Sequence, residues 1–195
     1  MDNGATVINM SFGKSYSWNK QVVDEAVKYA VKNDVLLVHA AGNDGKDNDT
    51  SDNFPNDGYK KRGWFKPKKA KTWMEIGALN YEMDEHAAAS FSNYGDQEVD
   101  VFAPGVEIYS TTSNDKYDSY PGTSMASPMV AGTAALLRSY FPELSATQVK
   151  EIIMESSVKS NAQVIIPGTE EDKTSFSNLS VSGCLLYTSP SPRDA

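Results

Sequence analysis

The sequence predicts an α/β fold built on a parallel sheet, and three consecutive segments carry this prediction. Residues Ala5–Phe12 (ATVINMSF) form a β-branched apolar run that is typical of a buried strand. Apolar residues then recur at spacings of three and four from Val22 to Val31, which indicates a helix with one apolar face. Residues Val35–Gly42 (VLLVHAAG) are almost continuously apolar, as in a strand buried on both faces. A strand, a helix and a strand in this order form a right-handed βαβ unit.

The later elements follow from the same patterns. Residues 44–59 are rich in Asn, Asp, Ser and Gly, so we expect a loop. Two further apolar runs, Trp73–Asn80 and Val99–Phe102, are strand candidates. A long helix is predicted over about Thr123–Tyr140, with alanines at its close-packing positions. Ser145-Ala-Thr-Gln148 is a capping box that begins a last amphipathic helix.

Composition excludes several classes of protein. With 195 residues, 39% hydrophobic residues and a net charge of −8, the chain is too apolar and too weakly charged to be disordered. It has one cysteine, which excludes a disulfide scaffold. No apolar run approaches the roughly 18 residues that a membrane-spanning helix requires. We therefore expect a globular domain that does not cross a membrane.

One segment departs from the acidic balance of the chain. Residues 60–71 hold seven basic side chains and no acidic one, with Trp64 and Phe65 between them. Such a patch can contact phosphates. A charge run is more often a solvated loop, however, and the acidity of the chain argues against a nucleic-acid partner. We expect no nucleic-acid binding.

The segment Gly122-Thr-Ser-Met-Ala-Ser-Pro128 carries the sharpest chemical signal. It places Ser124 where a glycine turn passes into the start of the predicted helix. Backbone N–H groups and the helix dipole favour negative charge at that position, which suits the nucleophile of an acyl transfer. A serine that only caps the helix is the alternative.

Two other segments follow neighbouring strands. In His39-Ala-Ala-Gly-Asn43, the asparagine stands at the carboxyl end of a parallel strand, where ligands bind in open α/β sheets. Its side-chain amide can stabilise an oxyanion, although an Asn in a turn is common. In Asn9-Met-Ser-Phe-Gly13, the backbone can add a strand to an extended peptide, and the glycine allows close approach.

These motifs together resemble the subtilisin-like serine peptidases. VINMSFG, HAAGNDG, ASFSNYG, VFAPGVEIYST and GTSMASPMVAGTAALL occur in the order and approximate spacing of that family, over nearly all of residues 5–156. The resemblance implies a doubly wound parallel sheet with helices on both faces. It also implies a serine endopeptidase that acts through an acyl-enzyme and takes peptide or protein substrates.

The resemblance assigns roles to particular residues. Ser124 matches the nucleophile, and Asn43 matches the amide of the oxyanion hole, with the backbone N–H of Ser124 as the second donor. The segment that pairs with the substrate backbone is matched by Ser11, Phe12 and Gly13. The floor of the specificity pocket is matched by Ala40, Ala41 and Gly42. The resemblance also places a cis peptide bond at Phe54-Pro55 and a family turn at residues 103–105.

Two members of the catalytic triad are not matched. Subtilisins carry an aspartate and then a histidine before the serine, and neither family context occurs in this sequence. The two histidines lie elsewhere: we expect His39 to be a packed strand residue and His86 to be a solvated loop residue. The sequence is therefore interpreted as the C-terminal part of a catalytic domain, whose partner is the missing N-terminal half, and as inactive by itself.

Two alternatives from other classes remain. The first is a non-catalytic pseudo-peptidase that binds peptides, which the retained Ser124 and Asn43 disfavour. The second is an unrelated α/β binding domain, which would require five motifs to coincide in order. The upstream coding sequence discriminates between them, because intact or degenerate triad motifs would be visible there.

The limits of the domain and its ligands complete the interpretation. We assign residues 1–183 to the peptidase domain and 184–195 to an adapter-derived, non-native tail, because CLLYTSPSPRDA resembles the translation of a sequencing adapter. The resemblance implies no required cofactor, although subtilases often bind calcium. Oxygen ligands gather in residues 47–52, but they lack the glycine and distal glutamate of a recognised calcium loop, so no metal is assigned. The family also implies a secreted or cell-envelope location.

Overall fold

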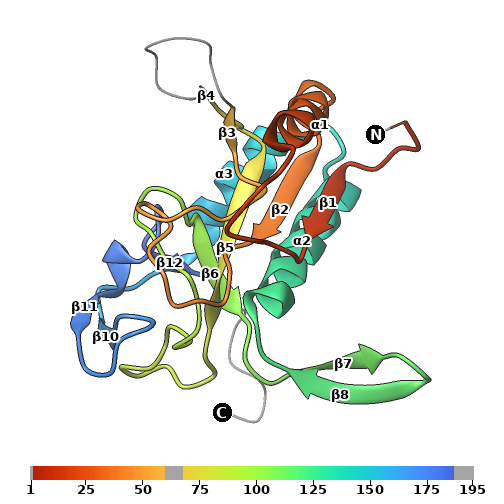
Figure 1. Cartoon of the computed structure of the whole chain (residues 1–195). Helices are drawn as coiled ribbons and strands as arrows, with labels where there is room; N and C mark the ends of the chain where they lie inside the picture. Colours follow the sequence, from red (N-terminus) through yellow and green to blue (C-terminus); the bar gives the residue numbers. More distant parts are fainter. Residues whose placement is uncertain (1, 60–67, 187–195) are drawn as a thin grey trace.

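A computed structural model describes residues 2–59 and 68–186, and its centre is a six-stranded sheet. The strands lie in the order β1, β2, β5, β6, β12, β9 (Figure 1). The strands β1, β2, β5 and β6 are parallel to one another. β12 is parallel to β6, and β9 is antiparallel to β12. The bounds of these strands are Val7–Met10, Leu36–Ala40, Trp73–Leu79, Val101–Pro104, Cys184–Leu185 and Val158–Lys159.

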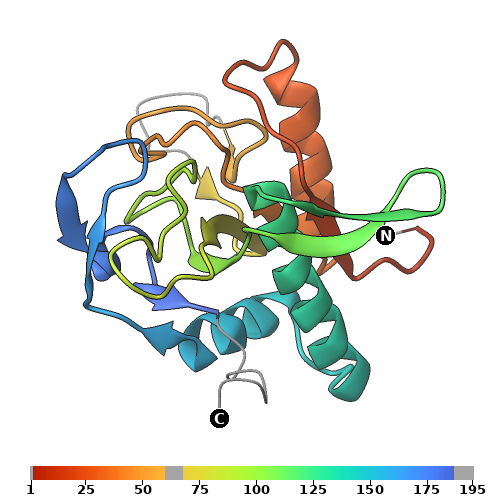
Figure 2. The same cartoon turned by 90° about the horizontal axis from the view of Figure 1, so that it is seen from below.

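Helices cover both faces of the sheet. α1 (Lys20–Lys32) packs on one face, and α2 (Thr123–Tyr140) and α3 (Ala146–Ser156) pack on the other (Figure 2). This arrangement confirms the predicted doubly wound α/β fold. The bounds of α2 are those that the sequence predicts.

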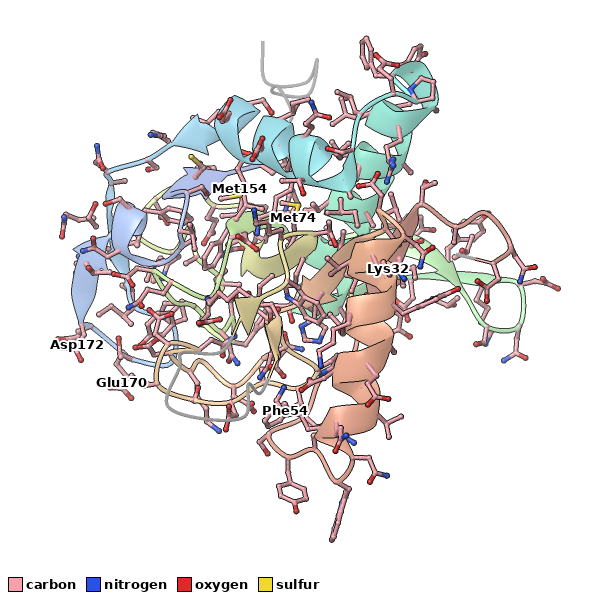
Figure 3. The ribbon with its side chains drawn as sticks, turned by 90° about the horizontal axis from the view of Figure 1, so that it is seen from above. Lys32, Phe54, Met74, Met154, Glu170 and Asp172 are labelled. Atoms are coloured by element: carbon pink, nitrogen blue, oxygen red, sulfur yellow. The ribbon has the colours of Figure 1, made fainter. Side chains whose placement is uncertain are left out.

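The core consists of two apolar layers on either side of the sheet. All five residues of β2 are buried, and their side chains alternate between the layers. Leu36 and Val38 pack against the small residues of α2, whereas Leu37 packs beneath α1. Met74 of β5 belongs to the cluster on the α2 side of the sheet, and Met154 of α3 packs against that cluster (both are labelled in Figure 3). Burying each aliphatic side chain of this size contributes about 1.5–3 kcal/mol, so β2 anchors both layers.

Side-chain caps set the positions of the helix ends around residue 34. The predicted capping box is present: Ser145 N donates to Gln148 Oε1 at 2.9 Å, and Gln148 N donates to Ser145 Oγ. Asp34 accepts from the N–H of Ala146 and from the Arg138 guanidinium at 2.8 Å. One carboxylate therefore joins the end of α2 to the start of α3.

The strand boundaries and several short elements differ from the predictions. β6 begins two residues later than predicted, at Val101. A hairpin not predicted from the sequence, β7 (Ile108–Thr112) and β8 (Lys116–Tyr120), projects from the body of the protein (Figure 1). Its turn contains Asn114 and Asp115 at φ 64° and 55°, the backbone that tight hairpins favour. The other short elements are β3 (Gly58–Tyr59), β4 (Lys68–Lys69), β10 (Gln163–Ile165), β11 (Lys173–Ser175) and a 3-10 helix at Phe176–Asn178.

Two regions singled out in the sequence are described only in part. Most of the basic run, residues 60–67, lies outside the described residues, as do residues 187–195 of the assigned tail. Cys184 and Leu185, which the sequence analysis left outside the fold, form strand β12 and are buried. They fit in the sheet because Leu185 pairs with Phe102 of β6, and because the side chains of Cys184 and Leu185 both lie in the apolar core. The origin of the tail stays a prediction.

Glycine 77 lies at the crowded centre of the sheet and provides a test of the packing. A Cβ atom at Gly77 would lie 2.6 Å from the Phe102 ring, whereas a Cβ atom at Gly132 of α2 would meet nothing within 4 Å. Gly77→Ala should therefore destabilise the protein by about 1–3 kcal/mol through overpacking. Gly132→Ala, the matched control, should stabilise it by up to about 1 kcal/mol through helix propensity. Thermal unfolding measures both, and equal shifts in the two midpoints would contradict this packing.

Candidate active site

Ser124 is the second residue of α2, directly after a backbone turn that only glycine adopts easily. Gly122 has φ 148°, and its N–H donates to Gly105 O at 2.7 Å. Gly105 itself tolerates no side chain, because a Cβ atom there would lie 2.7 Å from that of Ala78. The turn at residues 103–105 thus sets the start of α2, where unpaired N–H groups and the helix dipole stabilise negative charge.

Asn43 follows β2 and is oriented by Thr123. Its Oδ1 accepts hydrogen bonds from both the N–H and the Oγ1 of Thr123, each at 2.9 Å. The same hydroxyl accepts from the N–H of Gly42 at 3.2 Å. Because the amide oxygen is held in this way, the Nδ2 group is directed away from Thr123, and it has no partner within residues 2–59 and 68–186. The two N–H groups of the Asn43 amide thus remain available in the cavity that Asn43 and Ser124 both line.

Gly42 makes the turn between β2 and Asn43 possible. Its φ is 110°, and a Cβ atom there would lie 2.5 Å from Asn93 Nδ2. Asn93 Oδ1 accepts from the N–H groups of Asp44 and Lys46 at 3.0 and 3.1 Å. The buried Asn93 amide therefore holds the loop that carries Asn43.

The segment Ser11–Gly13 is attached to the start of α2. Ser11 Oγ donates to Ser124 O at 2.8 Å, and Ser124 Oγ donates to Ser11 O at 3.3 Å. In a regular helix the N–H of residue 128 would occupy Ser124 O, but Pro128 has no N–H. The proline thus leaves a carbonyl oxygen of α2 available for Ser11.

A cavity of about 580 Å³ connects these parts. Six predicted residues lie on its walls: Phe12, Gly13, Ala40, Gly42, Asn43 and Ser124. Ser11 lies next to them through its bonds to Ser124. Ala41 is fully buried beneath the cavity, and its carbonyl oxygen accepts from the amides of Asn48, Asn53 and Asn93 at 2.8–3.0 Å.

Sequence reasoning assigned no role to Thr123, Asn53 or Asn93. Asn53 lies against Gly13, where a Cβ atom would be 2.5 Å from its Oδ1, and it also lines the cavity. Thr123 and Asn93 stand within two of the quoted motifs, GTSMASP and ASFSNYG, which is a signal that could have found them. Asn53 stands in a polar loop of 16 residues with no such signal, next to Phe54-Pro55, whose peptide bond is cis as expected.

The two histidines lie as the sequence predicts. His39 is fully buried in β2 and bonds to Glu75 and Phe12, and His86 is exposed beside Glu85. Within the described ranges no histidine, lysine or carboxylate forms a hydrogen bond with Ser124 Oγ. Ser124 Oγ thus has Ser11 as its hydrogen-bond partner rather than a basic side chain.

Several side-chain oxygens of the loop at residues 47–52 accept hydrogen bonds from the protein itself. Asp49 carboxylate oxygens accept from the N–H groups of Gln97 and Glu98, and Asp47 Oδ1 accepts from the N–H of Asp49. Asn48 bonds to Ala41 and Asn93. The described part of the chain contains no cluster of three or more His, Cys, Asp or Glu that could hold a metal.

Comparison with known proteins identifies the family of this chain. The sequence profile of the subtilase family matches residues 1–180. The chain is 43% identical to subtilisin DY of Bacillus licheniformis over 150 residues, which are 76% of this chain and 48% of that protein. It is 39% identical to subtilisin NAT of Bacillus subtilis subsp. natto over 153 residues, 77% of this chain and 35% of that protein. An intracellular serine protease of Paenibacillus polymyxa is 34% identical over an alignment of 196 residues, which covers 94% of this chain and 55% of that protein.

The chain thus spans between about a third and just over half of the length of these relatives. None of the helices in residues 2–59 and 68–186 combines the length and the apolarity that crossing a bilayer requires. The order of the motifs, the position of Ser124 at the start of α2 and the match over residues 1–180 lead to one conclusion. This chain belongs to the subtilase family of serine peptidases.

Proposed function

We propose that this chain is part of a serine endopeptidase in which Ser124 is the nucleophile. The observation that carries the proposal is the pair of bonds from Thr123 to Asn43 Oδ1, which leaves the amide N–H groups of Asn43 beside Ser124. A neutral amide in that place favours an oxyanion that forms only in the transition state. The retained donors support an enzyme more than a pseudo-peptidase, the alternative that would bind peptides without cutting them.

The proposed reaction follows from these positions. Ser124 Oγ attacks the peptide carbonyl carbon, and its proton passes to a histidine base. The carbonyl oxygen becomes an oxyanion that accepts from Asn43 Nδ2 and from the backbone N–H of Ser124. Collapse of this intermediate breaks the C–N bond, and the base returns the proton to the leaving amine.

We infer that the base and its aspartate belong to sequence outside this chain. His39 has both ring nitrogens engaged in buried hydrogen bonds, and His86 is bonded to no part of the site. The strand β1 stands at the edge of the sheet, with one side not covered by a strand of the described chain. Such an edge suits the strand of a missing N-terminal half, which would carry the remaining triad residues.

The substrate is proposed to be an extended peptide. Ser11, Phe12 and Gly13 would pair with its backbone, and the side chain before the scissile bond would enter the cavity above Ala40, Ala41 and Gly42. The backbone N–H and C=O of Gly13 support this, because they have no hydrogen-bond partner among the residues that the structure describes. We propose a secreted or cell-envelope location, as the family resemblance implies.

Removal of the Asn43 amide tests the oxyanion hole. In the complete enzyme, Asn43→Ala should lower kcat by roughly 10²–10³ with little change in KM, because the contact forms mainly in the transition state. This magnitude is transferred from subtilisin and is not a property of this structure. Steady-state kinetics on a peptide substrate measures it, with Asn161→Ala on the exposed surface as the matched control. An unchanged kcat would remove Asn43 from the mechanism.

The 195-residue chain by itself should hydrolyse no peptide bond at a useful rate. A serine hydroxyl is a weak nucleophile at pH 7 without an adjacent base, and loss of the triad histidine in subtilisin costs about 10⁶ in kcat. Reaction with a fluorophosphonate probe and release of peptides from a denatured protein measure the activity, with Ser124→Ala as the control. Labelling that depends on Ser124, together with peptide release above a blank, would show that a base is present in this chain.

A further inference from the structure

A buried ion pair lies directly behind the segment that is proposed to bind the substrate. His39 is completely buried in β2, and its Nδ1 lies 2.9 Å from each carboxylate oxygen of Glu75 in β5. Its Nε2 lies 2.7 Å from the backbone oxygen of Phe12. Neither side chain touches Ser124 or Asn43, so the proposed chemistry makes no use of the pair.

The hydrogen-bond partners of His39 favour the imidazolium form. A backbone carbonyl can only accept a hydrogen bond, and so can an ionised carboxylate, and between two such partners both ring nitrogens donate. A neutral imidazole has one N–H group and satisfies only one of these partners. Burial lowers the pKa of His39, but the Glu75 carboxylate and the Phe12 carbonyl outweigh it and raise the pKa above its ordinary value.

Other donors hold the carboxylate in place. Trp73 Nε1 donates to Glu75 Oε2 at 2.8 Å, and Asn53 Nδ2 approaches Oε1 at 3.3 Å. The N–H of Glu75 donates to Asp100, which pairs with Lys150 at 2.7 Å. Glu75 is therefore held both at its carboxylate and at its backbone N–H.

The hydrogen bond between His39 and the Phe12 carbonyl holds the middle of the segment Ser11–Gly13. Ser11 is attached to Ser124 on one side of Phe12, and Lys14 pairs with Phe54 through two backbone bonds of 3.0 and 2.8 Å on the other. Successive carbonyl groups of an extended chain point to opposite sides. The Phe12 carbonyl, turned inward to His39, thus leaves the backbone groups of Gly13 turned outward.

We propose that His39 is a positioning residue, which as an imidazolium paired with Glu75 holds the Phe12 carbonyl and so keeps Ser11–Gly13 extended for a peptide substrate. This proposal rests on the proposed function and names a residue that determines substrate binding. When His39 loses a proton, the remaining proton stays toward the carboxylate. The Nε2 lone pair then faces the Phe12 oxygen at close range, and the repulsion displaces the segment.

The sign of the pH effect follows from the raised pKa. The contribution of His39 is fully present below its ordinary pKa, and it is lost as the pH rises through the raised value. Other charged groups also face this region. They line the cavity of about 540 Å³ on the far side of Glu75 and comprise Lys20, Asp49, Asp52, Asp57, Lys69 and Glu98. Burial raises the pKa of Asp57 to about 6, so Asp57 requires a control of its own.

Peptide binding across pH tests the proposal. The complete peptidase carrying Ser124→Ala binds a substrate peptide without cleaving it, and calorimetry measures its Kd between pH 6 and 9.5. Loss of one hydrogen bond corresponds to a Kd that rises roughly three- to tenfold at the alkaline end. The active enzyme should show the same rise in KM, and this rise should be absent from His39→Gln.

Glu75→Gln is the conservative variant that separates positioning from a structural role. The introduced amide can donate to Nδ1, so a neutral His39 keeps its proton on Nε2 and its bond to Phe12. Peptide affinity should therefore become independent of pH while staying near the wild-type value at neutral pH. Asp57→Asn, the matched control, should keep the wild-type profile. Nitrogen-15 NMR of the wild-type enzyme should show protons on both ring nitrogens of His39 at neutral pH.

Each outcome decides between the two proposals. A Kd that stays constant with pH in an active wild-type enzyme, or the same profile after Glu75→Gln, overturns the role of His39 alone. A singly protonated ring at neutral pH also overturns it. A complete protein that neither binds nor cleaves peptides overturns the proposed function, and with it the role of His39, whatever the ring shows. Thermal unfolding midpoints identify any variant whose loss of binding comes from unfolding.

Discussion

The contact between Thr123 and Asn43 is the constraint on which the rest of the site depends. It joins the start of α2 to the carboxyl end of β2, two segments that are 80 residues apart in sequence. Because both hydrogen bonds fall on the amide oxygen, the donors of Asn43 are oriented without any contact to their own nitrogen. In the proposed mechanism these donors are in place before a substrate arrives, and such preorganisation stabilises a developing charge.

Asparagine side chains connect the loops to one another by hydrogen bonds, as backbone pairing connects the strands of the sheet. The amides of Asn48, Asn53 and Asn93 converge on one carbonyl oxygen, that of Ala41. An amide both donates and accepts, so each can link two irregular segments that have no ladder of their own. Burial makes these bonds costly to break, because an unpaired polar group in the core loses its hydration without compensation.

His39 and Glu75 form a second buried polar contact, which is proposed to be an ion pair. Two buried ions are stable only when their remaining hydrogen-bonding atoms are satisfied, and here Phe12, Trp73 and Asn53 supply those partners. Removing one ion would leave the other uncompensated. Because the acceptor for His39 is the backbone oxygen of Phe12, the electrostatics of the core are linked to the shape of the segment that is proposed to bind the substrate.

The sequence by itself determined the βαβ unit, the bounds of α2, the capping box at Ser145 and the motifs that carry Ser124 and Asn43. These are properties of local spacing and of residue types that tolerate few backbone conformations. Only the tertiary structure decided the β7–β8 hairpin, the placement of β12 in the sheet, the contact of Asn53 with Gly13 and the partners of His39. The physical reason is that these features depend on which side chains come into contact after the chain has folded. Contacts between residues far apart in sequence produce no periodic pattern from which they could be predicted.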